Sequence, residues 1–361
     1  MSSDGVPNPP TAAWPPPQGP AVHDELVELS DAPLAGEVPG TVPGMADEPP
    51  PGEFEVIDGR GLYVRVTQPE PGPGPDAWYV HGLAGSSTNW IQLAGALAGT
   101  ARGYLVDLPG HGRSDPPPRG RYSLVDDADL VAAAIRRRSC GPVHLVGNSL
   151  GGMVVVALAH RHPDLVASLT LISPAVPDLR MTADRGADPR LALLLLPGTT
   201  GVATRRLGAL SPEDRARGMG ALCFGDPDLI TDAEYEAAAV ELGWRFGLPW
   251  LHTATIGSLR ALMTSYLTAG RWSFAAAART VRVPTLVIWG TRDKLVDARL
   301  AAPTAALFAD ARLLVLRGVG HTSQMEEPAT VARAVAALWR STGGTGAPHP
   351  GITSAVATSS P

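Results

Sequence analysis

The chain has 361 residues, of which 44% are hydrophobic and 5% aromatic, and its formal net charge is −6. This length is sufficient for one large α/β domain with an insertion. Residues 1–53 contain nine Asp and Glu and no Lys or Arg, so the rest of the chain is nearly neutral. A nearly neutral chain without a basic stripe argues against nucleic acid as a partner.

The cysteine content and the apolar runs limit the possibilities further. Cys140 and Cys223 are the two cysteines, and neither lies at metal-ligand spacing from other cysteines or histidines, so no disulfide framework or zinc site is predicted. Apolar runs such as residues 191–196 are far shorter than the roughly 18 residues that a membrane span needs. We therefore expect a cytoplasmic protein without stable membrane insertion, and the sequence leaves its oligomeric state open.

Both ends of the chain have the composition of disordered segments. Residues 1–52 hold 13 of the 36 prolines together with the acidic excess, a composition that buries too little apolar surface to offset the entropy of ordering. Residues 342–361 are rich in Gly, Ser, Thr and Pro. We predict a disordered acidic, proline-rich tail over 1–52 and a second disordered tail over 342–361.

Between the tails, short strand patterns alternate with longer helical patterns. Strands are predicted at 54–58, 62–67, 77–81, 103–108, 143–147, 168–173, 285–290 and 311–316, and helices at 88–98, 124–138, 150–160, 298–308 and 330–339. The later strands are almost continuously apolar, as parallel strands covered on both faces are. The pattern predicts an α/β fold with a mostly parallel, eight-stranded, doubly wound sheet.

One long segment interrupts this alternation. Residues 174–284 contain no convincing strand and are too many for a loop in a compact domain. Helix starts are indicated by Ser211 before Pro212 and by Thr231 with Glu234 as a capping box. A helix from about Thr253 is predicted to end at Gly270.

This segment divides the predicted domain into parts. We interpret residues 178–272 as a helical lid, inserted between a first core part at 53–177 and a second core part at 273–341.

The segment GNSLG, residues 147–151, contains the candidate nucleophile Ser149. It follows a buried strand and precedes an apolar helix, where a Gly-x-Ser-x-Gly turn requires neighbours without bulk. A serine needs a base that a third group holds in place. Asp293 and His321 follow the last two predicted strands, at the strand ends where doubly wound folds build their sites. Asp178, after the strand at 168–173, is the alternative acid.

Acyl transfer also needs an oxyanion hole made of two backbone N–H groups. Leu150, directly after the candidate nucleophile, is expected to supply the first N–H. The second is expected from the glycine turn HGLAG after the strand at 77–81, with Leu83 as the donor.

Five segments together resemble the α/β-hydrolase superfamily, in its lid-bearing serine branch. They are HGLAG at 81–85, DLPGHGRSD at 107–115, GNSLGG at 147–152, GTRDKLV at 290–296 and GVGHTSQMEEP at 318–328. The resemblance implies that Ser149 attacks a carbonyl carbon, that His321 moves the proton, and that Asp293 orients the imidazole, with an acyl-enzyme intermediate. It implies no metal and no cofactor. Because the nucleophile is serine, haloalkane dehalogenases and epoxide hydrolases, which use aspartate, are disfavoured.

Other polar residues near these motifs are expected to be structural. His81 is predicted to shape the oxyanion turn and His111 to sit in the PGHG turn. Lys294, the chain's single lysine, is interpreted as a solvated surface charge. In the lid, Trp244, Trp250 and Trp272 are candidates for lining an apolar substrate pocket, although the same aromatics could form the core of the lid.

The resemblance is specific for the fold and much less specific for the substrate. The leading hypothesis is a serine hydrolase that cleaves a small or medium hydrophobic carboxylic ester. A carbon–carbon bond hydrolase of the ring-cleavage type is an alternative, but its usual Gly-Pro-Gly oxyanion element is absent from HGLAGSS. A cofactor-free haloperoxidase or perhydrolase, and a non-catalytic ligand-binding protein of the same fold, are further alternatives.

Overall fold

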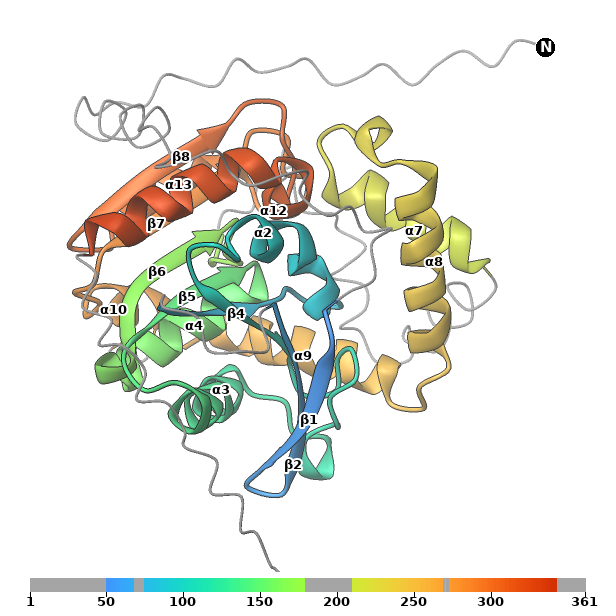
Figure 1. Ribbon diagram of the computed structural model, residues 1–361, viewed down its shortest axis with the longest axis horizontal. Coiled ribbons are helices and arrows are strands. Elements are labelled where there is room, and N and C mark those ends of the chain that lie inside the picture. The colour runs from blue at the N-terminus through green and yellow to red at the C-terminus, as the bar shows by residue number, and fades with distance from the viewer. Residues whose placement is uncertain (1–49, 68–74, 179–209, 269, 271–272, 343–361) are drawn as a thin grey trace, which may run out of the picture.

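The computed structural model describes residues 50–67, 75–178, 210–268, 270 and 273–342 (Figure 1). Nearly all of the two predicted tails, residues 179–209 of the predicted lid, and Trp272 lie outside the described residues. The predicted domain boundaries therefore stay predictions.

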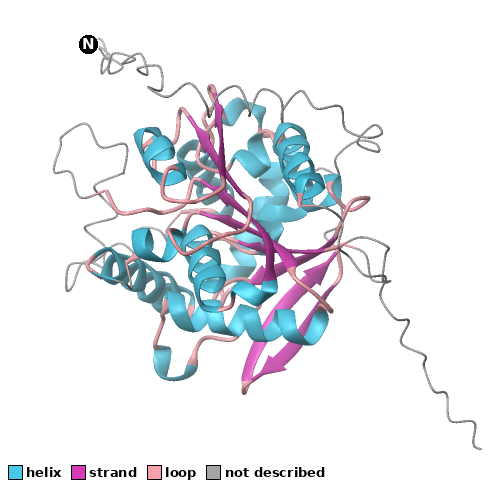
Figure 2. Ribbon diagram, turned by 90° about the vertical axis from the view of Figure 1, so that its left-hand side faces the viewer, coloured by secondary structure: helices cyan, strands magenta, loops and turns pink. Residues whose placement is uncertain are grey.

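An eight-stranded sheet forms the centre of the molecule (Figure 2). Its strands are β1 (Gly52–Ile57), β2 (Arg60–Val66), β3 (Asp76–Val80), β4 (Arg102–Asp107), β5 (Val143–Asn148), β6 (Val166–Ile172), β7 (Thr285–Gly290) and β8 (Ala311–Leu316). They lie in the order β1-β2-β4-β3-β5-β6-β7-β8. β2 is antiparallel to both of its neighbours, and all other adjacent pairs are parallel. The predicted mostly parallel, eight-stranded sheet is confirmed.

Helices cover both faces of the sheet (Figures 1 and 2). They are α2 (Ile91–Ala96), α3 (Leu124–Arg138), α4 (Leu150–Arg161), α7 (Pro212–Cys223), α8 (Asp232–Phe246), α9 (Leu251–Tyr266), α10 (Phe274–Ala278), α11 (Ala301–Ala305), α12 (Ser323–Glu326) and α13 (Pro328–Ser341). Short 3₁₀ turns include η1 (Ser87–Trp90), η2 (Pro118–Gly120), η3 (Pro163–Leu165), η4 (Pro227–Leu229) and η6 (Ala298–Leu300). α3, α4 and α10 pack together on one face, and α2, α12 and α13 pack together on the other.

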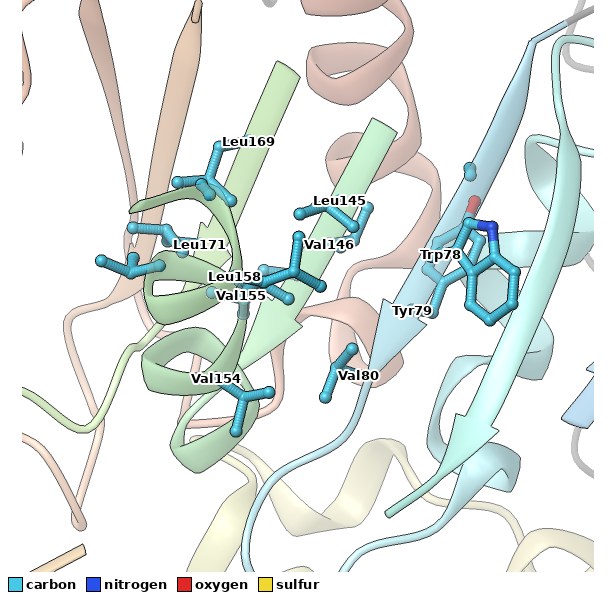
Figure 3. Close-up of a cluster of buried hydrophobic side chains, with 14 of the residues drawn as sticks. Trp78, Tyr79, Val80, Leu145, Val146, Val154, Val155, Leu158, Leu169 and Leu171 are labelled. Carbon is cyan, nitrogen blue, oxygen red and sulfur yellow. The ribbon is translucent and has the colours of Figure 1, made fainter. Parts of the chain in front are cut away.

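Local sequence explains why the core helices begin and end where they do. Ser123 accepts a hydrogen bond from the Asp126 N–H at the start of α3, and the last turn of this helix holds three arginines. Both features stabilise helix termini. α4 instead is apolar on nearly all sides, and a helix of this kind is stable only when it is buried. It lies against the central strands, where Val155 and Leu158 lie close to Val146 (Figure 3).

Two of the described helices between β6 and β7, α7 and α8, begin at the predicted residues, and α9 begins at Leu251, two residues before the predicted start. Ser211 caps α7, with Pro212 as the first helical residue, and Thr231 with Glu234 forms the capping box of α8. The predicted helix end at Gly270 is wrong, because α9 ends at Tyr266. Its last turn tightens there, as the N–H groups of residues 267 and 268 donate to carbonyls three residues earlier.

α7 and α8 pack against each other at one side of the molecule (Figure 1). Within the described ranges, no helix has both the length and the apolar character that a bilayer crossing requires.

The register of the parallel strands aligns their carboxyl ends. Gly147 of β5 is paired with Val80 of β3 on one side and with Leu171 of β6 on the other, and Leu171 is paired with Val287 of β7. The loops that follow these strands therefore leave the sheet at one edge, and side chains from distant parts of the sequence meet there.

Candidate active site

Ser149 occupies the sharp turn between β5 and α4. Its φ of 53° and ψ of −118° lie in a region that residues with a side chain rarely adopt, at a typical cost of about 1–3 kcal/mol. Backbone hydrogen bonds hold this conformation: the Ser149 N–H donates to the Ile172 carbonyl at 3.0 Å, and the Ala175 N–H donates to the Ser149 carbonyl at 3.0 Å. The segment that follows β6 thus fixes the strained turn.

The glycines around Ser149 are required by close backbone approach. A methyl group on Gly151 would overlap the carbonyl oxygens of Val80 and His81, and one on Gly152 would lie 2.9 Å from the Cβ of Pro174. Both contacts are shorter than side-chain carbons tolerate. The two glycines after Ser149 therefore reflect the packing of α4 against the end of β3 and against the segment that follows β6.

Asp293 and His321 form a buried pair. His321 Nδ1 lies 2.8 Å from Asp293 Oδ2, and the two side chains are 4% and 0% exposed. The other oxygen, Oδ1, accepts the N–H groups of Leu295 at 2.8 Å and Val296 at 2.9 Å. Because Asp293 Oδ2 accepts a hydrogen bond from Nδ1, we assign the proton to Nδ1, which leaves Nε2 able to accept one. The acid that hydrogen-bonds to His321 is therefore Asp293, the acid of the leading prediction.

Asn148 joins the strand that carries Ser149 to the loop that carries His321. Its Nδ2 donates to the Ile172 carbonyl at 3.0 Å and to the His321 carbonyl at 3.1 Å, and its side chain is buried. A buried amide with two such bonds fixes the backbone of both segments. Sequence reasoning missed Asn148, although a polar residue at the end of an otherwise apolar strand is a signal that could have identified it.

The two predicted oxyanion donors lie at this edge of the sheet. Leu150 N–H belongs to the first residue of α4, so it has no acceptor within the helix. Gly82, next to Leu83, approaches the serine closely, because a methyl group on Gly82 would lie 3.1 Å from the Ser149 Cβ. Among the residues that the structure describes, neither Leu83 nor Leu150 donates its N–H to an acceptor. Both donors are therefore available to a substrate oxygen.

His81 sets the orientation of the peptide that carries the Leu83 N–H. His81 Nδ1 donates to the Gly82 carbonyl at 2.7 Å, and the Gly85 N–H donates to the same carbonyl at 3.0 Å. In a trans peptide the carbonyl and the next N–H point in opposite directions. Holding the Gly82 carbonyl on the His81 side thus turns the Leu83 N–H to the other side.

Burial keeps two histidines near this turn neutral. Burial lowers the pKa of His81 to about 3, and burial, followed by the nearby His81, lowers the pKa of His111 to about 3. Leu108 N–H donates to His81 Nε2 at 3.0 Å, which also requires a neutral ring. The structural roles expected for both residues agree with these surroundings.

Asp107, at the end of β4, organises the neighbouring turn. Its carboxylate accepts the N–H groups of Ser87 at 2.5 Å and of Arg113 at 2.8 Å. Burial raises the pKa of Asp107 nevertheless. These bonds connect the start of η1 to the PGHG turn, and they thereby support the HGLAG turn at residues 81–85, the oxyanion loop, which precedes η1.

A comparison with protein families agrees with this geometry. The family model described as alpha/beta hydrolase fold matches residues 79–328. The chain belongs to the α/β-hydrolase family. The match extends from β3 to the first residue of α13, and it therefore includes Ser149, Asp293 and His321.

Named relatives of this α/β-hydrolase have several activities. A monoacylglycerol lipase of Xenopus laevis is 24% identical over 287 residues, which are 76% of this chain and 78% of the relative. A 2-(acetamidomethylene)succinate hydrolase of Mesorhizobium japonicum is 29% identical over 271 residues, 74% of this chain and 88% of the relative. A solved meta-cleavage product hydrolase from Pseudomonas fluorescens IP01 has a TM-score of 0.63 at 21% identity, covering 80% of this chain and 98% of that chain.

The predicted pocket tryptophans lie in different surroundings. Trp244 of α8 is 44% exposed, and the Arg113 guanidinium lies 4.5 Å from the centre of its ring. Trp250 is the residue before α9, and its buried indole Nε1–H has no partner among the described residues. Trp272 lies outside the described residues. Their role as pocket residues stays a prediction.

Three residues of this α/β-hydrolase bond to the backbone around the site in ways that the sequence did not indicate. Lys294 is exposed, as predicted, but its Nζ also donates to the carbonyls of Ala221 at 2.7 Å and Phe224 at 3.1 Å at the end of α7. Glu326 accepts three backbone N–H groups. Arg245 of α8 is 5% exposed and donates from Nη2 to the Ala84 carbonyl at 2.6 Å.

No group of three or more His, Cys, Asp or Glu side chains suited to a metal ion occurs in the part of the chain that the structure describes.

Proposed function

We propose that this α/β-hydrolase cleaves small or medium hydrophobic carboxylic esters through an acyl-enzyme. The observation that carries the proposal is the 2.8 Å hydrogen bond between His321 and Asp293, at the sheet edge where the strained turn presents Ser149. A serine hydroxyl is a weak nucleophile without a base, and an imidazole held by a carboxylate is the base that hydrolases of this kind use.

In the proposed reaction, Ser149 Oγ attacks the ester carbonyl carbon while His321 Nε2 takes the hydroxyl proton. The carbonyl oxygen becomes an oxyanion, which the N–H groups of Leu83 and Leu150 stabilise; one such donor typically contributes about 2.7–4 kcal/mol to the barrier reduction. The tetrahedral intermediate expels the alcohol, which receives the proton from His321. Water then attacks the acyl-enzyme by the same steps and releases the acid and free Ser149.

Asp293 stabilises the imidazolium that forms at each proton transfer. Its Oδ1 is already occupied by two backbone N–H groups, so the carboxylate cannot rotate without breaking both bonds. Oδ2 thus stays directed at His321, and the ring keeps the tautomer that the reaction needs.

The proposed substrate class follows from the relatives and from the composition of the helical segment. The similarity to a monoacylglycerol lipase supports an ester of a hydrophobic acid. Apolar and aromatic residues are frequent between β6 and β7, which fits a small hydrophobic substrate rather than a highly charged one.

A carbon–carbon bond hydrolase is the second candidate, because a meta-cleavage product hydrolase shares the fold over 80% of this chain. The same serine, histidine and oxyanion donors would act on a vinylogous ketone instead of an ester. The absence of a Gly-Pro-Gly element from HGLAGSS makes it the weaker candidate.

Two measurements test the proposal. A fluorophosphonate probe should label the wild type and not Ser149→Ala, and p-nitrophenyl esters from C2 to C12 should be hydrolysed by the wild type alone. If the wild type is not labelled and hydrolyses no ester faster than Ser149→Ala does, serine hydrolysis is refuted. A dienone ring-cleavage substrate consumed faster than every ester would favour the carbon–carbon reaction.

A further inference from the structure

The end of helix α7 packs directly on the loop that carries His321. We name residues 221–226 the anchor segment. Within it, the Cys223 carbonyl accepts the backbone N–H of His321 at 2.7 Å and that of Thr322 at 3.3 Å. The contact leaves no room for side chains, because a methyl group on Gly320 would lie 2.6 Å from the carbonyl carbon of Phe224. The backbone of the candidate base thus rests on the anchor segment.

The carboxylate of Glu326 connects the anchor segment to the loop that carries His321. Glu326 Oε2 accepts the N–H of Gly320 at 2.7 Å and the N–H of Gly225 at 3.0 Å, while Oε1 accepts the N–H of Asp226 at 3.0 Å. Gly320 directly precedes His321, and the other two donors belong to the anchor segment. Glu326 therefore bonds both sides of the contact at once, and charge-assisted bonds of this kind are stronger than neutral ones.

The loop that carries Asp293, residues 291–297, bonds to the carbonyl groups of the anchor segment. Lys294, next to Asp293, donates to the carbonyls of Ala221 and Phe224, and Arg292 Nη1 lies 3.5 Å from the Gly225 carbonyl. A cation at these carbonyls also complements the negative end of the α7 dipole. The carbonyl groups of the anchor segment are thus bonded to cations next to Asp293, and its N–H groups are bonded to the carboxylate of Glu326 at the end of α12.

We propose that Glu326 is a positioning residue for His321. Glu326 holds His321 in place by bonding the anchor segment to the loop that carries His321, residues 317–322. The inference rests on the proposed function in taking His321 as the base. Asp293 fixes the imidazole end of His321, whereas Glu326, through Gly320 N–H and the Cys223 carbonyl, fixes its backbone end. With both ends held, the ring position relative to Ser149 depends on the end of α7.

Glutamine cannot replace Glu326 in this role. The carboxylate accepts three N–H groups with two oxygens, whereas the amide of glutamine has one acceptor oxygen and presents an NH₂ group to the remaining donor. Either the Asp226 N–H or the pair at Gly225 and Gly320 would then face another donor.

The test compares Glu326→Gln with Glu327→Gln. Glu327 is the adjacent carboxylate, and its Oε2 accepts the Thr330 hydroxyl at the start of α13 instead of reaching the anchor segment. In Glu326→Gln we expect kcat on the best ester to fall on the order of 10- to 100-fold, the effect of a displaced catalytic group, with KM within about twofold of wild type. Glu327→Gln should retain both constants within about twofold.

Amide hydrogen exchange gives a readout that does not depend on activity. In Glu326→Gln, peptides that cover residues 218–228 and 317–327 should exchange on the order of tenfold faster together, as expected when a charged hydrogen bond is lost, and other peptides should be unchanged. The far-downfield proton resonance of His321 Nδ1 should broaden in the same variant. If Glu326→Gln does not fold, Glu326→Asp, which keeps the charge but shortens the reach, should show the same paired increase.

Each outcome decides the inference. Unchanged exchange at residues 317–327, or exchange that rises only at 218–228, would overturn the positioning role whatever the activity. Paired loosening with full activity would overturn it too. Paired loosening in a protein whose wild type hydrolyses no substrate would leave Glu326 holding His321 while refuting the proposed hydrolysis.

Discussion

The buried imidazoles of His81 and His111 lie with their ring centres 5.4 Å apart, behind the oxyanion loop. His111 Nδ1 donates to the Pro109 carbonyl at 3.1 Å, and its Nε2 has no partner among the described residues. Burial lowers the pKa of each ring to about 3. The folded protein therefore keeps both rings neutral at pH values where the unfolded chain would protonate them.

This difference predicts how stability depends on pH. Between the unfolded pKa near 6.5 and the folded pKa of about 3, the unfolded chain binds more protons, so stability is lost as the pH falls through this window. One such histidine contributes a slope of up to about 1.4 kcal/mol per pH unit. His111→Asn keeps an N–H donor for Pro109 without titrating, so its free energy of unfolding should decline less steeply below pH 6.5.

Urea denaturation of wild type and His111→Asn at pH 7, 6, 5 and 4.5 checks this prediction. The gap in free energy of unfolding should move in favour of the variant by roughly 1 kcal/mol per pH unit toward acid. Parallel pH profiles for the two proteins would show that His111 titrates normally in the folded state.

The strain at Ser149 predicts an unusual order of stabilities in two inactive variants. Alanine keeps the Cβ at a φ of 53°, whereas glycine adopts this conformation without steric cost. Both variants lose the hydroxyl, so their difference reports the strain alone. We expect Ser149→Gly to be more stable than Ser149→Ala by about 1 kcal/mol, although glycine is usually the less stable of the two by about 0.5–1 kcal/mol.

Thermal or urea unfolding of the two proteins provides the measurement. The same pair of substitutions at Ser258, in the interior of helix α9, serves as the control for ordinary backbone geometry, where glycine should be the less stable of the two. An equal or lower stability of Ser149→Gly relative to Ser149→Ala would mean that the turn is unstrained.

Local pattern was sufficient to predict the sheet and the residues at its edge. All eight strands and helix α3 lie within two residues of the predicted positions, because their apolar period and caps are short-range properties. The glycines around Ser149 marked the turn, and the strand ends indicated Asp293 and His321. These signals all lie within a few residues of the feature that they predict.

The residues that prediction missed bond to backbone groups far along the chain. Glu326 reaches Gly225, Arg245 reaches Ala84, and Asn148 reaches His321, with sequence separations of 101, 161 and 173 residues. A backbone acceptor has no residue-type signature, so nothing in the sequence marks it as the partner. The end of α9 was mispredicted for a different, local reason: the helix closes in a tightened last turn, with N–H groups bonded three residues back, before the chain reaches Gly270.

The geometry of Asp293 predicts the effect of an amide at this position. In Asp293→Asn, Oδ1 must remain with the N–H groups of Leu295 and Val296, so the new NH₂ group faces His321 Nδ1. The ring is then forced to carry its proton on Nε2 and cannot accept the serine proton. We expect kcat on the best ester to fall on the order of 10⁴-fold.

Asp178→Asn is the matched variant, because Asp178 was the alternative acid and the hydrogen bond of His321 Nδ1 is to Asp293. It should retain kcat within about twofold. The two proteins should be compared by ester hydrolysis and by the rate of fluorophosphonate labelling, with circular dichroism to confirm folding. Loss of activity in Asp178→Asn with retention in Asp293→Asn would reverse the assignment of the acid.

Arg245 predicts a link between helix α8 and the oxyanion loop. Its buried guanidinium donates to the carbonyl of Ala84, whose φ of 57° is unusual for a residue other than glycine. Burial lowers the pKa of Arg245, and the carboxylates of Glu241 and Asp107 offset part of that effect. Arg245→Met keeps much of the apolar stem but leaves the Ala84 carbonyl without this donor, at a cost of roughly 2–3 kcal/mol in stability.

Because Ala84 directly follows Leu83, the loss should also reach the oxyanion donor. We expect Arg245→Met to lower kcat on the order of tenfold with a smaller change in KM, since a donor to the oxyanion acts mainly in the transition state. Arg260→Met, an exposed arginine of α9, is the control and should leave both constants and the stability within error. A stability loss in Arg245→Met with unchanged kcat would mean that Arg245 holds α8 to the core without affecting the Leu83 N–H.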